Sequence, residues 1–357
     1  MIDSPLPQSK VRELTSGIDA LYLSGNGSTP TRLLDHLEAE KEEARDNSAR
    51  IPFILGGEEF GLSPHGWGKY AFSLDHANGR IGFTRSEKLP RVRVQPRAHF
   101  LHGAGVEPAV EWFSETVGEQ VADLQWRVSR IDLFVDVQGW VPTVADRGRF
   151  VTRSRSLDMH ERNNSFTGYT FGSRRGGGIS GRAYDKTADV ARTGALYWFD
   201  LWGDRYQERE PVFRVEFEFG RTVLNQFGIK SPADAFASVG DLWAYGTEWL
   251  SLRDSTSDET KSRWPVSAEW QAIANATLRS RRIGAARAKQ RLQQGSIRKM
   301  MPGLCGSMAK FGWLADTVDL PSTLSRFERE ALRYGSRTAT SFETRLMARH
   351  REMPWTD

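Results

Sequence analysis

The residues with the clearest chemical potential in this chain lie in the segment Gly181-Arg182-Ala183-Tyr184-Asp185-Lys186. Side chains of a β-strand alternate between its two faces, so Arg182, Tyr184 and Lys186 would stand on one side. A tyrosine hydroxyl flanked by two cations is suited to bind or attack a phosphate group. The same alternation is also typical of an edge strand whose tyrosine only packs. Which interpretation holds depends on the residues that lie near this strand.

Two other segments would each present carboxylates on one face of a strand. Residues 131–137 and 213–219 both have apolar side chains at their odd positions, which we expect to face the core. The opposite faces then carry Asp132 and Asp136 in the first segment and Arg214, Glu216 and Glu218 in the second. If these strands neighbour the tyrosine strand, their carboxylates would form a site for a hard divalent ion, Mg²⁺ or Mn²⁺, acting on a phosphodiester. A solvated sheet face with cross-strand salt bridges would show the same pattern.

The elements that must position these residues follow an order that occurs twice. The first part of the chain predicts a strand at 17–24, a helix starting near residue 30, a hairpin over 69–84, a strand at 91–97 and a helix over 107–121. From residue 127 this order begins again with short echoes, such as Arg-Val-Glu at 214–216 against Arg-Val-Gln at 93–95. Only the second copy carries the full group of tyrosine, cations and carboxylates described above. In the first copy Gly82 or Phe83 stands where the second copy has Tyr184.

We therefore predict an α+β fold in which duplicated strand-helix-hairpin-strand units form one large, curved, mainly antiparallel sheet with helices on one face. A helical C-terminal region follows the sheet. The predicted domains are residues 1–125, a first repeat for scaffold and DNA binding, residues 126–230, a second repeat with the catalytic site, and residues 231–357, a helical, basic DNA-binding region.

Four motifs together resemble the replication-initiation factor family, which comprises rolling-circle plasmid replication initiators and related relaxases of integrative conjugative elements. They are Arg-Ile-Asp-Leu-x-x-Asp at 130–136, Tyr-x-Phe-Gly-Ser-Arg at 169–174, Arg-Ala-Tyr-Asp-Lys at 182–186 and Arg-Val-Glu-Phe-Glu at 214–218. The resemblance covers roughly residues 15–230 and implies that Tyr184 is the DNA-nicking nucleophile and that Asp132 and Glu216 hold the metal. The loop at 172–181 and the insertion at 187–209 depart from the family pattern, and the role of that insertion stays open.

The resemblance implies an enzyme, a metal-dependent endonuclease that nicks and rejoins DNA at a replication or transfer origin. Attack by Tyr184 would leave a 5′-phosphotyrosyl link and a free 3′-hydroxyl, and so initiate rolling-circle replication. Because a tyrosine has a pKa near 10, Arg182, Lys186 and the metal would be needed to favour the phenolate. The expected partners are double-stranded origin DNA, single-stranded DNA, a host helicase and a second copy of the chain. Alternatives are a conjugative relaxase of an integrative element and a non-catalytic DNA-binding replication factor.

Further cations are candidates for DNA binding. Arg174 and Arg175 lie in a glycine-rich loop beside the tyrosine strand, and Arg214 lies on the second carboxylate strand. Residues 271–315 contain no acidic side chain, which is typical of a phosphate-binding region. The candidates in this stretch are Arg281, Arg282, Arg287, Lys289 and Arg291.

Bulk composition excludes several other classes of protein. The chain has 357 residues, a net charge of +4 and a pI of about 9.2. Its single cysteine, Cys305, permits neither a disulfide framework nor a cysteine-ligated zinc site. No apolar run is long enough to span a membrane, and the first residues lack the pattern of a signal peptide. We therefore expect a cytoplasmic protein without a membrane partner.

Overall fold

The structure is a computed structural model that describes residues 10–173, 177–279, 296–338, 341–344 and 346–347. The chain divides into two compact units, residues 1–289 and residues 290–357. The predicted boundary at residue 125 falls inside the larger unit, and so does the one at residue 230. The two predicted repeats and the start of the C-terminal region therefore share one compact body.

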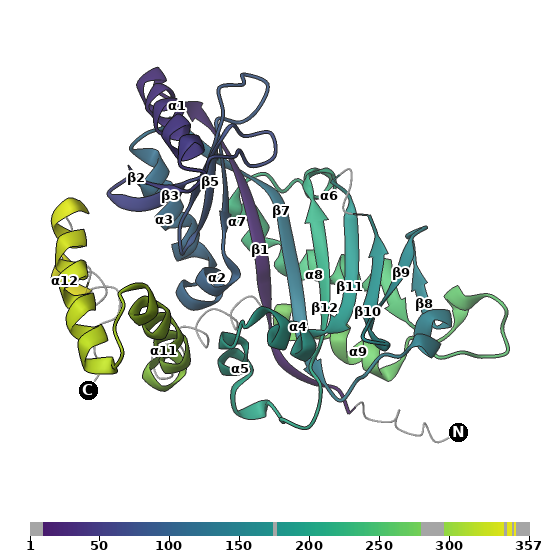
Figure 1. Cartoon of the computed structure of the whole chain (residues 1–357). Helices are drawn as coiled ribbons and strands as arrows, with labels where there is room; N and C mark the ends of the chain where they lie inside the picture. Colours follow the sequence, from purple (N-terminus) through teal and green to yellow (C-terminus); the bar gives the residue numbers. More distant parts are fainter. Residues whose placement is uncertain (1–9, 174–176, 280–295, 339–340, 345, 348–357) are drawn as a thin grey trace. The chain divides into compact units, whose positions relative to one another are not determined.

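One eleven-stranded antiparallel sheet forms the centre of the larger unit (Figure 1). From one edge to the other its strands are β2 (Ile51–Leu55), β3 (Glu58–Leu62), β4 (Phe72–Asp75), β5 (Gly79–Phe83), β6 (Val92–Pro96), β1 (Arg12–Ser28), β7 (Ala122–Gln138), β12 (Phe213–Gly220), β11 (Ile179–Asp185), β10 (Ser165–Gly172) and β9 (Leu157–Arg162). A separate two-stranded ladder joins β8 (Phe150–Thr152) to β13 (Leu250–Leu252). The predicted α+β class with a large antiparallel sheet is confirmed.

The two long strands β1 and β7 lie side by side at the middle of this order. Outward from β1 come β6, β5, β4 and β3, and outward from β7 come β12, β11, β10 and β9. Each half of the chain thus contributes one central strand and arranges its own hairpins beside it. This order is what two similar units sharing one sheet would produce, while the internal duplication itself stays a prediction.

Three helices accompany the first half of the sheet, namely α1 (Thr31–Asp46), α2 (Ala98–Ala104) and α3 (Val106–Gly118). Helix α1 buries Leu33, Leu34 and Leu37, the apolar stripe at helical spacing. The hairpin predicted around Asn78-Gly79 is present as β4 and β5. The hairpin of β2 and β3 had no counterpart in the sequence prediction.

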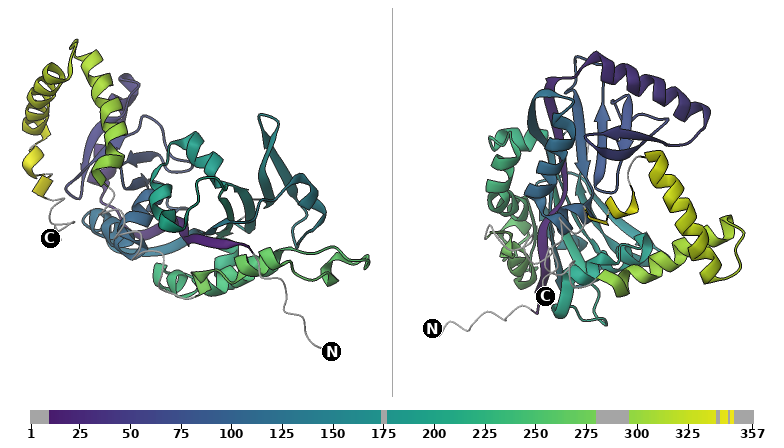
Figure 2. Two further views of the ribbon diagram at one scale, coloured as in Figure 1. Left: turned by 90° about the horizontal axis from the view of Figure 1, so that it is seen from below. Right: turned by 90° about the vertical axis from the view of Figure 1, so that its left-hand side faces the viewer.

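Helices of the second half cover both faces of the sheet (Figure 2). On one face Trp243 of α8 packs against Phe217, with ring centroids 5.4 Å apart. On the other face Trp198 of α5 packs against Phe134, also at 5.4 Å. The prediction of helices on one face only is wrong here, because the insertion at 187–209 carries aromatic side chains that cover the second face.

The helical elements of this half follow in chain order. They are η1 (Val144–Gly148), α4 (Lys186–Thr193), α5 (Tyr197–Trp202), η2 (Gly203–Arg205), α6 (Arg221–Gln226), α7 (Pro232–Ala237), α8 (Val239–Trp249), η3 (Lys261–Arg263), α9 (Ala268–Ala274) and η4 (Thr277–Arg279). Trp270 of α9 is buried in the same core as the sheet, so α9 belongs to the body of the larger unit.

The smaller unit contains the helices α11 (Ser296–Leu314) and α12 (Leu320–Thr338). Phe311 and Phe327 join them with ring centroids 5.6 Å apart. A helical C-terminal region is therefore present. The predicted DNA-binding residues Arg281, Arg282, Arg287, Lys289 and Arg291 lie outside the described residues. Across the described part of the chain, no helix combines the length and apolar character needed to span a bilayer.

Candidate active site

Tyr184 lies near the end of β11 and lines an open cleft of about 830 Å³. Its neighbour across the β10–β11 ladder is Gly168, at a φ of +151°. A Cβ at Gly168 would stand 2.8 Å from the Tyr184 Cβ and 2.4 Å from the carbonyl oxygen of Ala183, so a side chain there would collide with β11. The cleft is also lined by the ionisable residues Asp19, Asp158, His160, Arg162, Arg182, Asp185, Lys186, Asp189, Arg192 and Glu216.

The three strands that the sequence singled out are neighbours in the sheet, in the order β7, β12, β11. Directly opposed residues in an antiparallel pair share one face. The opposed pairs are Tyr184 with Arg214, Arg182 with Glu216, Arg214 with Asp136 and Glu218 with Asp132. The condition on which the predicted site depended is therefore met.

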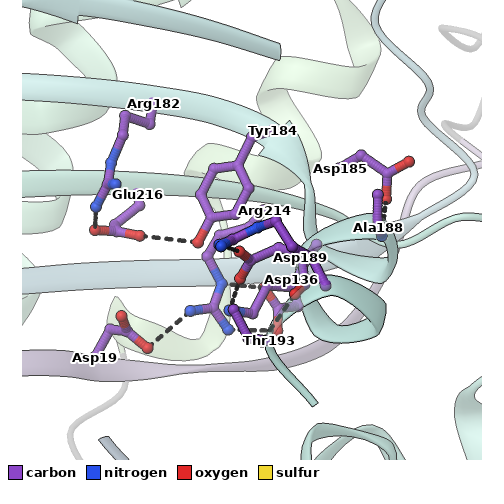
Figure 3. Close-up of polar contacts among 12 residues, drawn as sticks. Asp19, Asp136, Arg182, Tyr184, Asp185, Ala188, Asp189, Thr193, Arg214 and Glu216 are labelled. Atoms are coloured by element: carbon purple, nitrogen blue, oxygen red, sulfur yellow. Dashed lines mark hydrogen bonds and ion pairs between the residues drawn. The ribbon is translucent and has the colours of Figure 1, made fainter. Parts of the chain in front are cut away.

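Glu216 connects Tyr184 to Arg182 (Figure 3). The Tyr184 hydroxyl donates a hydrogen bond of 3.3 Å to Glu216 Oε2. The Arg182 guanidinium forms an ion pair with the other carboxylate oxygen, Oε1. Glu216 is 1% exposed, while the Arg182 side chain keeps 28% of its surface exposed. The arrangement places a proton acceptor at the tyrosine hydroxyl and a cation behind that acceptor.

The tyrosine is a neutral phenol in this environment. Burial raises the pKa of Tyr184 well above its ordinary value, and the nearby charges of Glu216 and Asp19 add to this effect. Arg214 and Arg182 act in the opposite direction without reversing it. In the protein alone, attack by this hydroxyl requires a base, while the expectation that Arg182, Lys186 and a metal together favour the phenolate stays a prediction.

Lys186 has a different partner from the one expected. Its ammonium group binds Asp189 of α4 at 2.8 Å and lies 5.8 Å from the centre of the Tyr184 ring. Burial lowers the pKa of Lys186, and the nearby Arg214 adds to this effect. Lys186 therefore borders the tyrosine from the start of α4, with its charge already balanced by a carboxylate.

Arg214 is an internal residue with no exposed surface. Its Nε and Nη2 donate to the two carboxylate oxygens of Asp136 at 2.6 and 2.8 Å, and its Nη1 donates to Asp19 at 2.7 Å. Its guanidinium carbon lies 3.9 Å from the Phe134 ring centre and 4.0 Å from that of Trp198. The predicted contact of Arg214 with DNA is wrong for this structure, because every side of the group is occupied by protein.

Asp136 does not fit the role of metal ligand that its position suggested. Both of its oxygens accept from Arg214, and one also accepts from Trp202 Nε1 at 2.8 Å. Asp132 lies four residues away on the same strand, so the α carbons of the two residues are about 13 Å apart. Oxygens that share a Mg²⁺ ion lie about 2.1 Å from it, so one ion cannot bind both residues.

Asp132 lies in a second group of charges. Its carboxylate accepts from Arg130 Nε at 2.7 Å, and Arg130 also binds Glu218 at 2.8 Å. Burial raises the pKa of Asp132 to about 7, with Glu216 and Glu218 adding to the rise and Arg130 opposing it. Within the described residues no three acidic, histidine or cysteine side chains are placed to hold a metal ion. The predicted set of Asp132, Glu216 and Asp136 is not assembled, and the use of Mg²⁺ or Mn²⁺ stays a prediction.

Two residues at the centre of this site were missing from the sequence prediction. Asp19 binds Arg214 and lies 3.6 Å from His102 Nε2. Trp198 comes from the insertion that follows the tyrosine strand. The one available signal was the Ile-Asp pair at 18–19, which matches Ile-Asp at 131–132. Arg174 and Arg175 lie outside the described residues.

No family model matches the sequence, and no curated protein matches it. Among solved structures, the chain is similar to a rolling-circle replication initiator protein from Geobacillus stearothermophilus. The two share 14% sequence identity with a TM-score of 0.44, over 76% of this chain and 98% of that one.

Proposed function

We propose that the protein cuts one DNA strand at a replication or transfer origin, with Tyr184 as the nucleophile, and so initiates rolling-circle replication. The observation that carries the proposal is the hydrogen bond from the Tyr184 hydroxyl to the buried Glu216 carboxylate at the edge of an open cleft. A neutral tyrosine becomes a nucleophile when a positioned base takes its proton during attack. The motif resemblance supports the same reaction.

The chemical step is an exchange of one phosphate ester for another. The Tyr184 oxygen bonds to a DNA phosphorus while its proton passes to Glu216 Oε2. The bond from that phosphorus to the 3′ oxygen breaks, and this oxygen takes a proton from water and leaves as a hydroxyl. The products are a 5′-phosphotyrosyl link and a free 3′ end. The reverse reaction rejoins the strand, and Glu216 returns the proton to the tyrosine.

Arg182 is suited to stabilise the charge that develops on the phosphate. Its guanidinium is anchored by Glu216 on one side and is partly exposed towards the cleft. A guanidinium held in place by one carboxylate keeps further N–H donors for phosphate oxygens. Lys186 is proposed to act through its place beside the tyrosine ring, which limits where a phosphate can enter.

The test is cleavage of supercoiled DNA that carries the candidate origin, with Mg²⁺ or Mn²⁺ present. Wild-type protein should yield relaxed circles and a covalent protein–DNA product that survives denaturing electrophoresis. Tyr184→Phe should yield neither, while its affinity for origin DNA stays within a few fold. Tyr245→Phe is the matched control, because Tyr245 lies on α8, packs against Phe227 and does not line the cleft. Cleavage by Tyr184→Phe would refute the proposal.

The same assay separates the alternatives. Specific origin binding without any cleavage by wild-type protein would indicate a non-catalytic replication factor. Cleavage at the transfer origin of an integrative element, and not at a plasmid replication origin, would indicate a relaxase. The host helicase and the homodimer remain predictions.

A further inference from the structure

The face of the sheet that carries Tyr184 continues onto the first half of the chain. The opposed pairs that lead across it are Arg182 with Glu216, Glu218 with Asp132, and Arg130 with Tyr22. The ion pair from Arg130 to Glu218, at 2.8 Å, follows the same face. Tyr22 and Tyr184 therefore point to the same side of the sheet, one from each half.

Arg93 of β6 is held between two aromatic rings on this face. Its guanidinium carbon lies 5.0 Å from the centre of the Tyr22 ring and 4.3 Å from that of Trp67. Trp67 belongs to a turn that lies on Gly82, the strand neighbour of Arg93. A Cβ at Gly82 would come within 3.1 Å of both Trp67 and Tyr70, so the missing side chain allows this turn to lie on the sheet.

The environment of Arg93 matches that of Arg214, its counterpart in the sequence echo between 93–95 and 214–216. Arg214 is likewise held between a ring from a central strand, Phe134, and a tryptophan from a covering segment, Trp198. The two sites differ in the partners of the guanidinium N–H donors. Arg214 binds carboxylates there, whereas no acidic side chain among the described residues pairs with Arg93.

An arginine in such a position is prepared to bind an anion. Stacking on aromatic rings occupies the two faces of the guanidinium and leaves its N–H donors free in the plane. Those donors match two oxygens of a phosphate group, as they match the two oxygens of Asp136 at the other site. At Arg93 no carboxylate among the described residues takes up these donors, as Asp136 and Asp19 do at Arg214.

Other cations gather beside Arg93. Arg221 is half-buried and donates to Ser24 Oγ at 3.0 Å. Burial lowers the pKa of Arg221, and the positive charge of Arg127 adds to this effect. Burial also lowers the pKa of Arg93, with a further contribution from Arg130. Such crowding of positive charge favours a ligand that brings several negative charges at once.

We propose that Arg93, Arg221, Tyr22 and Trp67 bind the single DNA strand that continues from the Tyr184 cleft, with Arg93 on a backbone phosphate. This proposal rests on the proposed function, since it takes DNA as the ligand of the Tyr184 cleft. Strands β6 and β11 are four strand spacings apart, or about 19 Å. Arg93 stands opposite Ser24, whereas the line of paired residues from Tyr184 reaches β1 at Thr15, about 30 Å away along that strand. The bound strand would therefore cross the sheet obliquely over several extended nucleotides. A basic surface with interspersed aromatic rings is the usual platform for single-stranded DNA.

The experiment measures binding of fluorescent oligonucleotides by anisotropy, with the cleavage site at a fixed position and increasing length on either side. Wild-type affinity should rise when the oligonucleotide becomes long enough to reach Arg93. Arg93→Gln should bind the long oligonucleotide about tenfold more weakly than wild type does. Its affinity for the short oligonucleotide should equal that of wild type. The slope of log Kd against log salt should fall by about 0.7, the value for one phosphate contact on a single strand.

Three variants make the result decisive. Arg32→Gln removes the same charge from an exposed position on α1 and should bind like wild type. Arg93→Lys should keep the salt slope and recover only part of the affinity, because it loses the planar stack. Arg221→Gln tests the same surface if Arg93→Gln fails to fold by circular dichroism.

The proposal is overturned if Arg93→Gln and Arg221→Gln both keep the full gain from length, or if short and long oligonucleotides lose affinity equally. An equal gain with RNA of the same sequence would also overturn it, by assigning the surface to RNA. Cleavage of the short oligonucleotide is measured in parallel. Cleavage that persists in Tyr184→Phe would refute the proposed function, and this outcome is independent of the length-dependent binding.

Discussion

Replacing Arg214 by methionine removes the cation on which the buried part of the site depends. Arg214 and Asp136 are both fully buried, and Arg214 makes three short hydrogen bonds to Asp136 and Asp19. Methionine can fill the space between Phe134 and Trp198, but it has no donor for either carboxylate. The substitution therefore leaves two negative charges beside each other without their cation.

The expected loss follows from this burial. Breaking a buried ion pair by removing one partner costs about 3–5 kcal/mol of unfolding free energy, because the remaining charge stays in the interior. Replacing the second partner as well should restore part of the loss. Arg214→Met combined with Asp136→Asn keeps an amide oxygen for the Trp202 hydrogen bond and removes one of the two stranded charges.

The loss should depend on pH with a definite sign. Burial by itself would raise the pKa of Asp19, but Arg214, together with His102, lowers it well below its ordinary value. A carboxyl group with a lowered pKa stabilises the fold above its unfolded pKa of about 3.9 and loses this contribution as pH falls through the folded value. The variant lacks this contribution, so its deficit should be full at pH 7 and should shrink as pH falls below about 4.

Urea unfolding at pH 7 and at about pH 3, one unit below the unfolded pKa of Asp19, measures both effects when followed by tryptophan fluorescence. Trp198 and Trp202 report directly on the altered site. Arg192→Met is the control, because Arg192 forms an exposed ion pair with Asp189 and should change stability by less than about 1 kcal/mol. A loss below about 1 kcal/mol for Arg214→Met at pH 7, or equal losses at both pH values, would refute the reasoning.

Two further predictions concern cleavage. Glu216→Gln keeps an oxygen near the Tyr184 hydroxyl but removes the base, so single-turnover cleavage should slow by about 10²–10⁴-fold with DNA affinity retained; a rate within threefold of wild type would exclude Glu216 as the base. If Asp132 contributes to binding Mg²⁺ or Mn²⁺, Asp132→Ala should raise the ion concentration needed for half-maximal cleavage, and an unchanged titration would remove Asp132 from the candidate ligands.

Strand alternation predicted which residues share a face of the sheet, because that property depends only on neighbours in the chain. The alternation at 131–137 and 213–219 placed Asp132, Glu216 and Arg214 on the face that the structure shows. No face was predicted for Asp19, which lies where the register of β1 shifts between Ile18 and Ala20. An irregularity of this kind breaks the period of two, so the face of the residue inside it cannot be read from the sequence.

Whether a shared face is open or covered depends on contacts between distant parts of the chain. The sequence pattern allowed Arg214 to be exposed to DNA, yet Trp198 and Phe134 enclose it. Trp198 belongs to the insertion at 187–209, whose helices are short and lack a long apolar period. For the same reason the choice between metal ligand and ion-pair partner could not be made for Asp136, because it depends on Trp202 and Arg214.

The two stacked arginines give a physical meaning to the difference between the halves of the sheet. In the second half Arg214 is neutralised by Asp136 and Asp19, and Tyr184 and Arg182 line the cleft in which we propose that a phosphate binds. In the first half Gly82 leaves room for Trp67 to lie over Arg93, and no acidic side chain among the described residues pairs with that arginine. Under the two proposals above, one half cuts a strand and the other holds it. One sheet can support both tasks, because the change from one to the other needs only a few side chains on its shared face.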